Sequence, residues 1–261
     1  MTIRIRTLAQ ELWLPVALVT AWWFASKDST SVYFPPLSRI MESFRDLWLF
    51  ERVGSDVVPT LQTVFLGLGL SVLIGVAVGT VLAFWPPVHR AVEPMLQFGW
   101  SIPKLAILPA IMAIFGIGSE TRLVFVVLGT VWPILLSTVE GFRSLDAVVV
   151  ETARSYRVRT VDRFFRIYLP GASPAIIAGI RTSLEIALAL TVVSEMVASS
   201  SGVGFFVLQS QQSFAIPDMW AGALLLGIIG YALNLGFRLI EHRVLRWHTG
   251  RIAAVSGGEH S

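Results

Sequence analysis

The sequence predicts an all-α polytopic membrane protein whose chain crosses the bilayer about six times. Of its 261 residues, 54% are hydrophobic and only 14% are charged, and the mean hydropathy is +0.71. Long apolar runs occupy almost the whole chain, and a soluble domain of this size could not bury so much apolar surface. We therefore expect a single membrane domain over residues 1–261, ending in a tail at about 241–261.

The first span is expected at residues 10–26. Arg4 and Arg6 precede it, and because basic residues collect in cytoplasmic segments, they place the N-terminus in the cytoplasm. A cleavable signal peptide would need small residues after the apolar run, where this chain has the bulky Trp22 and Trp23. The pattern therefore favours an uncleaved first helix.

An amphipathic helix is expected in the polar segment that follows, residues 27–56. Its apolar residues recur at helical spacing opposite charged ones, which predicts a helix lying on the outer face of the membrane. These apolar residues are Leu37, Ile40, Met41, Phe44 and Leu47.

The second span is predicted at residues 57–88, where no residue is charged. Gly67, Ser71, Gly75 and Gly79 repeat every four residues along it, so one face carries almost no side chain. In lipid such a face lets another helix approach closely, although glycine is also commoner in membrane helices in general.

Four further spans complete the expected bundle. Their ranges are 91–116, 122–140, 173–198 and 218–238. Pro103 and Pro109 interrupt the first of these four, and Ser173 followed by Pro174 is typical of a helix start. With about six spans both termini lie on one side, and this side then carries most of the 20 basic residues.

The most charged stretch lies between the fourth and fifth spans, at about residues 142–173. Its arginines are Arg143, Arg154, Arg157, Arg159, Arg163 and Arg166. We expect two short helices here, over 146–156 and 161–168, the second capped by Thr160 and stopped at Leu169-Pro170-Gly171. Such a segment could dock on a partner protein or lie on anionic lipid.

Three parts of this stretch resemble the EAA loop of bacterial ABC importer permeases. They are Glu151-Thr152-Ala153, Arg157 after three more residues, and Ile167-Tyr168-Leu169-Pro170 after nine more. The spacing is that of the family motif, but Arg157 replaces a glycine that lets the chain turn between the two helices. An arginine there must avoid the left-handed conformation or carry its cost of about 1 kcal/mol.

The resemblance extends over nearly the whole chain. The stretches SIPKLAILPAIMAIFGIG, LGTVWPILLSTVEGFRSLD and VVSEMVASSSGVGFFV are similar to those of nitrate, sulfonate and taurine permeases. It implies the type I ABC importer (MetI-like) fold, a multi-pass protein of the bacterial inner membrane with both termini cytoplasmic.

The resemblance also implies partners. Two permease chains, expected to be a homodimer, would pair around a central pathway for a small anionic solute such as a sulfonate, taurine or nitrate. An extracytoplasmic binding protein would deliver the solute. Two cytoplasmic ATPase subunits, which bind ATP and Mg, would receive the coupling loop. The residues that match the motif are Glu151, Thr152, Ala153, Arg157, Ile167, Leu169 and Pro170, and among these Glu151 is the candidate for a charge pair with the ATPase.

The chain itself is not expected to be an enzyme or to hold a cofactor. Its lysines, Lys27 and Lys104, do not end a phosphate-binding loop, so a partner must hydrolyse ATP. It has no Cys, and its four His lie at segment ends or in the tail, so no metal site is expected. Basic cytoplasmic loops explain the net charge of +3 without nucleic acid.

Four charged residues inside the expected spans are candidates for the pathway, because such residues usually face a bundle interior or water. Arg181 and Glu185 lie one helical turn apart, and the alternative is that they neutralise each other. Glu195, near the outer end of its helix, is either a gate or an interfacial residue. Lys104 either attracts an anion or extends to the membrane surface.

Two other classes of membrane protein are alternatives for a chain with about six spans. A proton-coupled secondary transporter could use Arg181, Glu185 and Glu195, but residues 1–130 and 131–261 show none of the internal similarity that such folds often carry. A membrane-embedded enzyme would need a nucleophile with a base, or metal ligands, inside the membrane. No His lies in the expected spans, which disfavours this class.

Overall fold

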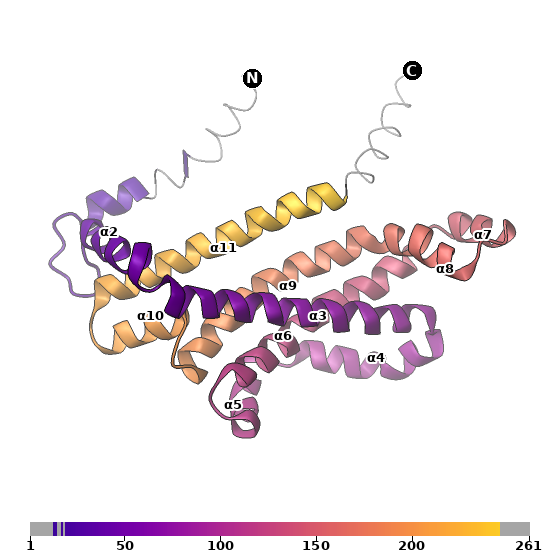
Figure 1. Cartoon of the computed structure of the whole chain (residues 1–261), viewed down its shortest axis with the longest axis horizontal. Coiled ribbons are helices and arrows are strands. Elements are labelled where there is room, and N and C mark those ends of the chain that lie inside the picture. The colour runs from indigo at the N-terminus through magenta and orange to yellow at the C-terminus, as the bar shows by residue number, and fades with distance from the viewer. Residues whose placement is uncertain (1–12, 15–16, 18, 246–261) are drawn as a thin grey trace, which may run out of the picture.

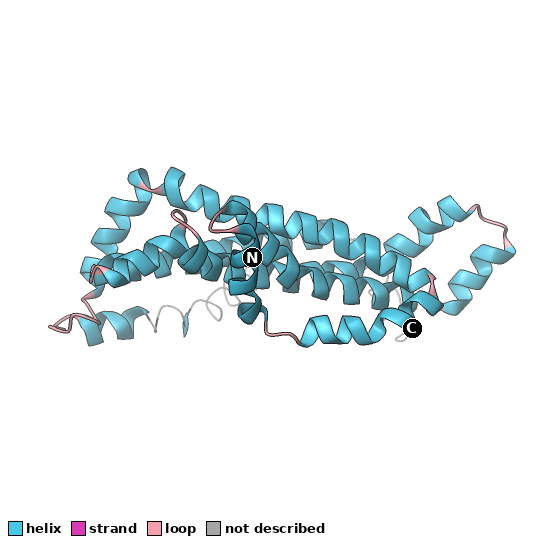
Figure 2. Ribbon diagram, turned by 90° about the horizontal axis from the view of Figure 1, so that it is seen from below, coloured by secondary structure: helices cyan, strands magenta, loops and turns pink. Residues whose placement is uncertain are grey.

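The computed structural model describes residues 13–14, 17 and 19–245, and all regular structure in this part of the chain is helical. The long helices run side by side along the length of the molecule (Figures 1 and 2). Residues 19–26 are helical. Residues 10–12, 15–16 and 18 of the predicted first span, the residues before it and most of the tail lie outside the described residues.

Four described helices are long and apolar enough to cross a membrane. They include α3 (Val58–Phe84), α6 (Ser119–Arg143), α9 (Leu169–Ala198) and α11 (Ile216–Val244). A fifth crossing is available if α4 (Pro86–Ser101) and α5 (Lys104–Phe115) count together. The second, fourth, fifth and sixth predicted spans therefore correspond to single helices.

The predicted interruption of the third span at Pro103 is confirmed, because α4 and α5 meet there at an angle of 94°. The predicted interruption at Pro109 is wrong, because Pro109 lies inside α5. Ile102 and Pro103 are extended at the bend. Pro103 causes the conformation of Ile102, because the residue before a proline is disfavoured in the α conformation. The pair Pro86-Pro87 follows the end of α3 at Phe84 and begins α4, since the first helical turn tolerates proline.

The centre of the bundle is α6, which packs against α3 on one side and α9 on another. A Cβ atom added to Gly75 or Gly79 of α3 would lie 2.9 Å from Ile134 Cγ2 or 2.7 Å from Thr138 Cβ. The side-chain-free face of α3 is therefore a contact face. Ser71 Oγ at the middle of this face lies 2.7 Å from Thr130 Oγ1.

The predicted amphipathic helix is α2 (Leu37–Asp46). Leu37 and Ile40 are buried against α10 (Val203–Gln212) and α11. Two π-helical turns, η1 (Leu47–Glu51) and η2 (Val53–Val57), then lead into α3. Figure 1 shows α2 and α10 at one end of the bundle and α7 at the other. We call these the outer end and the coupling end.

The coupling end differs from the prediction in its second half. The first short helix is confirmed as α7 (Ala147–Ser155), whose cap Asp146 accepts a hydrogen bond from the N–H of Val148 over 2.8 Å. The second begins as α8 (Thr160–Arg163), with Arg159 rather than Thr160 at the capping position.

This second helix does not stop at Leu169-Pro170-Gly171. It continues through the π-helical turn η3 (Phe164–Tyr168) into α9. Proline has no N–H, so it is tolerated in the first turn of a helix, where N–H groups have no intrahelical acceptor, and where a π-turn interrupts the regular hydrogen bonding. The predicted start at Ser173 is therefore also wrong, because the Ser173 hydroxyl donates to the Pro170 carbonyl inside the continuous helix.

Candidate functional site

The segment formed by α7, α8 and η3, which we call the coupling segment, projects from the coupling end (Figure 1). Its base is a cluster of aromatic rings. Phe84 lies 5.2 Å from Phe142 and 5.3 Å from Tyr168, measured between ring centroids, and Phe142 lies 5.9 Å from Phe164. These rings join α3, α6 and η3, so the projecting segment rests on a rigid support.

The motif residues divide into a buried group and an exposed group. Ala153 is buried, Ile167, Leu169 and Pro170 are half-buried, and Ile167 and Leu169 pack with the aromatic cluster. Glu151 and Thr152 are exposed on the surface of α7. Within the described residues Glu151 forms no ion pair, so its carboxylate is free for a partner.

Large apolar side chains accompany Glu151 on this exposed side. The side chain of Val148 is 68% exposed and that of Tyr156, just after α7, is 81% exposed. Such residues on a short projecting helix are typical of a docking element, because they gain contact area only when another surface covers them.

The turn after α7 passes through Arg157, whose φ is +51°. The Val158 N–H donates to the Ala153 carbonyl over 3.2 Å, and the Arg157 N–H donates to the Arg154 carbonyl over 2.9 Å. This pattern is the Schellman motif, which normally takes glycine at the left-handed position. Arg157 therefore keeps the turn and carries the conformational cost.

Lys104 lies at the bend between α4 and α5. Its ammonium group donates to the carbonyls of Gly99 (2.8 Å), Trp100 (2.7 Å) and Ile102 (3.1 Å). These carbonyls belong to the C-terminal end of α4, where the helix leaves acceptors without partners. The three donors of Lys104 are thus used to close α4.

Arg181 and Glu185 do not neutralise each other, contrary to one of the two expectations. Each reaches from α9 to α11 instead: Arg181 pairs with Glu241 at 3.4 Å, and Glu185 accepts a hydrogen bond from Asn234 at 3.0 Å. Glu185 is exposed, and it lies two residues from Ser183, whose hydroxyl donates to Thr130 near the middle of α6. An exposed carboxylate therefore stands about halfway along the bundle.

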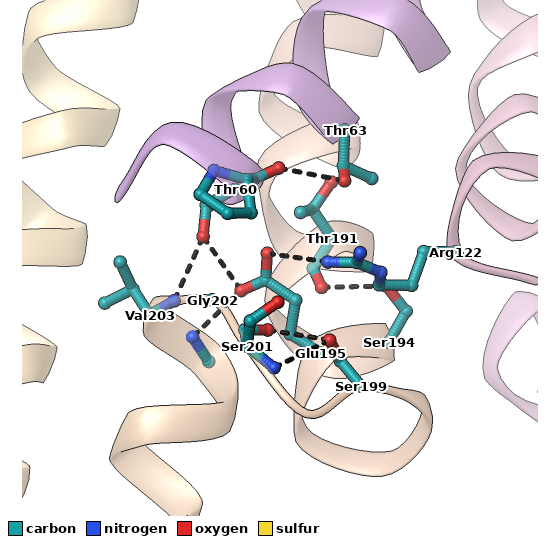
Figure 3. Close-up of polar contacts among 12 residues, drawn as sticks. Thr60, Thr63, Arg122, Thr191, Ser194, Glu195, Ser199, Ser201, Gly202 and Val203 are labelled. Atoms are coloured by element: carbon teal, nitrogen blue, oxygen red, sulfur yellow. Dashed lines mark hydrogen bonds and ion pairs between the residues drawn. The ribbon is translucent and has the colours of Figure 1, made fainter. Parts of the chain in front are cut away.

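Glu195 is fully buried, at 0% exposure, so it is not an interfacial residue. Its Oε2 atom accepts hydrogen bonds from the Thr60 hydroxyl (3.0 Å) and the Gly204 N–H (2.9 Å). Its Oε1 atom lies 3.7 Å from a guanidinium nitrogen of Arg122, which is 8% exposed (Figure 3). The four charged candidates thus lie in three separate places: at the α4–α5 bend (Lys104), between α9 and α11 (Arg181 and Glu185), and at the outer end (Glu195).

Sequence reasoning missed the partners of Glu195. Asp56, Thr60 and Arg122 are far from it in sequence, and Arg122 is the first residue of the predicted span 122–140. The local signals were Asp56 and Arg122, each at the start of an apolar run, and the small residues of Gly202-Val203-Gly204. None of these signals indicates that the residues contact one another. Among the described residues no group of His, Asp and Glu could hold a metal ion.

Comparisons with known proteins point to one family. Residues 71–246 match the family described as binding-protein-dependent transport system inner membrane component. The taurine transport system permease protein TauC of Escherichia coli (strain K12) is 28% identical over 258 residues, covering 95% of this chain and 90% of that protein. The putative aliphatic sulfonates transport permease protein SsuC of Bacillus subtilis (strain 168) is 27% identical over 238 residues, covering 90% and 86%.

A relative with another name is nearly as similar. The formylaminopyrimidine transport permease protein ThiX of Halalkalibacterium halodurans is 26% identical over 232 residues, covering 88% of this chain and 92% of that protein. Among solved structures, one of the MetNI methionine ABC transporter in inward facing conformations matches with a TM-score of 0.66 and 21% identity. It covers 76% of this chain and 97% of that one. The two chains share a fold.

Proposed function

Because the chain belongs to the family of binding-protein-dependent transport system inner membrane components, we propose that it pairs with a second copy to form the membrane pathway of an ATP-driven importer. The family match covers more than half of the chain. The chain is the transmembrane subunit of an ABC importer, a transport component, and its fold is shared with the MetNI methionine ABC transporter. In this assembly ATP and Mg are bound by the partner ATPase.

The single observation that carries the coupling role is the exposed, unpaired surface of α7. Glu151 has no ion-pair partner within the described residues, and Val148 and Tyr156 are largely exposed beside it. The aromatic cluster beneath α7 would transmit a push or pull on this helix to α3, α6 and α9. We assign α7 as the element that inserts into the ATPase, with Glu151 at its charged contact.

Glu185 is the best of the four candidates for the pathway. Lys104 closes α4, Arg181 is paired with Glu241, and Glu195 is buried. Glu185 alone is exposed halfway along the bundle, where a carboxylate facing lipid would be costly and one facing a water-filled pathway would not. The Glu185–Asn234 pair is therefore assigned to the pathway wall.

The outer end offers a surface for the binding protein. Phe214, in the turn before α11, is 67% exposed with φ at +59°. It borders a hollow of about 600 Å³, whose lining includes Tyr33, Gln211 and Gln212. Aromatic and amide side chains around an open hollow suit a transient protein contact.

The cargo class follows from the named relatives. Both TauC and SsuC are named for sulfonates, taurine being an aminoalkanesulfonate, and they cover 95% and 90% of this chain. We therefore assign a small organic sulfonate as the cargo. The secondary-transporter alternative loses support, because Arg181, Glu185 and Glu195 contact three different partners and form no continuous relay.

Co-purification tests the coupling role. The tagged chain is expressed together with the ATPase of its importer, and the amount of ATPase retained is measured. Tyr156→Asp places a charge in the proposed contact and should abolish retention. Tyr33→Asp, which changes an exposed tyrosine at the outer end, is the matched control and should retain the ATPase. Equal retention by both variants would contradict the assignment.

A further inference from the structure

The N-terminus of α10 is capped by other helices. Gly202 stands at the capping position and has no side chain to accept a hydrogen bond. The N–H groups of residues 202–204 donate instead, in order, to Asp56 Oδ1 (3.1 Å), Thr60 Oγ1 (3.0 Å) and Glu195 Oε2 (2.9 Å). Figure 3 shows the Thr60 hydroxyl between the N–H of Val203 and the carboxylate of Glu195. The positive end of the α10 dipole thus faces two carboxylates.

This contact depends on the absence of two side chains. Gly202 has φ at +107°, and a Cβ atom there would lie 2.4 Å from the carboxyl carbon of Glu195. A Cβ atom on Gly204 would lie 2.4 Å from the Val192 carbonyl oxygen. The segment therefore fits directly against the end of α9.

The charges around this contact balance, but their pairing is incomplete. Asp56 is paired with Arg52 at 3.3 Å, while Glu195 and Arg122 approach only to 3.7 Å. Three buried atoms around this contact have no hydrogen bond within the described residues. They are Nε and Nη1 of Arg122 and Oε1 of Glu195. A buried ion pair that is only partly hydrogen-bonded contributes little net stability, since desolvation offsets the attraction.

The contact joins five elements at the outer end: η2, α3, α6, α9 and α10. A second polar contact, at mid-bundle, joins α3, α6 and α9 through Ser71, Thr130 and Ser183. It consists of uncharged groups with hydrogen bonds of 2.7 and 2.8 Å. The mid-bundle contact has the features of a permanent joint. The outer contact has the features of a joint that opens. Separation of Glu195 from Arg122 would let water bind the polar atoms that now lack hydrogen-bond partners.

We propose that Glu195 and Arg122, with the N-terminus of α10, form an outer latch that closes the outer end of the pathway and separates during each transport cycle. The inference rests on the proposed importer function. Glu195 acts as a positioning residue that holds α10 against α3 and α9, and opening to the outside requires its release.

Cross-linking tests the latch directly, because the chain contains no cysteine. Thr60→Cys and Val203→Cys are combined, and the thiols are joined with a short reducible reagent in the full complex with its ATPase in lipid nanodiscs. The control joins Ser71→Cys to Thr130→Cys, whose native oxygens lie 2.7 Å apart at mid-bundle.

Closing the 60–203 pair should lower ATP turnover about tenfold or more, and reductant should restore it, because a required opening step is blocked. The 71–130 pair should leave turnover unchanged. Unchanged turnover in the cross-linked 60–203 complex would overturn the latch, as would an equal loss from both pairs. If the reduced complexes do not hydrolyse ATP at all, the importer function fails first and the latch fails with it.

Charge removal gives a second test that needs no cross-link. Glu195→Gln keeps the acceptor for Thr60 and Gly204 but removes the attraction to Arg122, and Arg122→Gln removes it from the other side. Each should raise ATP hydrolysis without binding protein by about threefold, and the double variant should show no further rise. A purely structural role would instead lower stability while leaving this basal rate unchanged, and that result would overturn the proposal.

Discussion

The Val158 N–H donates to the Ala153 carbonyl over 3.2 Å, and this bond turns the chain back after α7. Between the two residues, Arg157 holds a left-handed backbone at φ +51°. The exposed side of α7 is presented at a fixed angle only while this turn is kept. The turn for which the EAA loop uses glycine is therefore kept here with an arginine, at the cost of backbone strain.

Replacing Arg157 should separate backbone strain from side-chain contacts. Arg157→Gly and Arg157→Ala both remove the guanidinium, but only glycine relieves the left-handed strain of about 1 kcal/mol. We expect the amide of Val158 to exchange its hydrogen about fivefold more slowly in the glycine variant than in the alanine variant. Hydrogen exchange with mass spectrometry measures this, and equal exchange would show that the turn is not strained.

Reversing the charge of Glu151 should uncouple the chain from its ATPase. Glu151→Lys places a cation where we propose a charge pair with a basic residue, so uptake should be lost while membrane insertion is kept. Glu42→Lys makes the same change on an exposed residue of α2 at the outer end. Uptake is measured in reconstituted liposomes with the ATPase and ATP inside and the binding protein outside, and normal ATP-driven uptake with Glu151→Lys would disprove the pairing.

The glycine face of α3 should tolerate no methyl group where it meets α6. A Cβ atom at Gly79 would lie 2.9 Å from the Leu135 carbonyl oxygen, a backbone atom that cannot move aside, whereas Gly69 has nothing within 4 Å. Gly79→Ala should cost about 1–3 kcal/mol of stability and Gly69→Ala almost nothing. Thermal unfolding in detergent compares the two, and equal midpoints would show that α3 and α6 are not in this register.

Lys104 should stabilise the bend rather than attract cargo. Lys104→Met leaves three carbonyls of α4 without their donor and should cost about 2 kcal/mol, whereas Lys104→Arg keeps a cationic donor. The unfolding midpoint should fall much further for methionine than for arginine. A methionine variant of normal stability that transports poorly would favour the alternative role of attracting an anion.

The sequence was sufficient where one segment determines its own structure. Uncharged runs predicted the spans, helical spacing predicted α2, and the repeat of small residues from Gly67 to Gly79 predicted a contact face. A short helix was predicted to begin at about Asp146, and in the structure Asp146 caps α7. Each of these features depends on neighbours in the sequence or on the bilayer, and both can be read from a single chain.

The features that the sequence did not predict depend on contacts between distant segments. The helix from Thr160 to Ala198 passes through Pro170 and Pro174 because a π-turn and packing on α6 support it. Glu195 is buried because Thr60, Arg122 and the N-terminus of α10 meet it in space. No spacing rule connects these residues, so the outer latch became visible only in the structure.

The source of energy for uptake tests the central claim most directly. The chain is reconstituted into liposomes with its ATPase inside and its binding protein outside, and entry of labelled taurine is followed. Uptake should require internal ATP and persist when a protonophore collapses the proton gradient. Uptake without ATP that follows an imposed proton gradient would contradict the assignment and favour a secondary transporter.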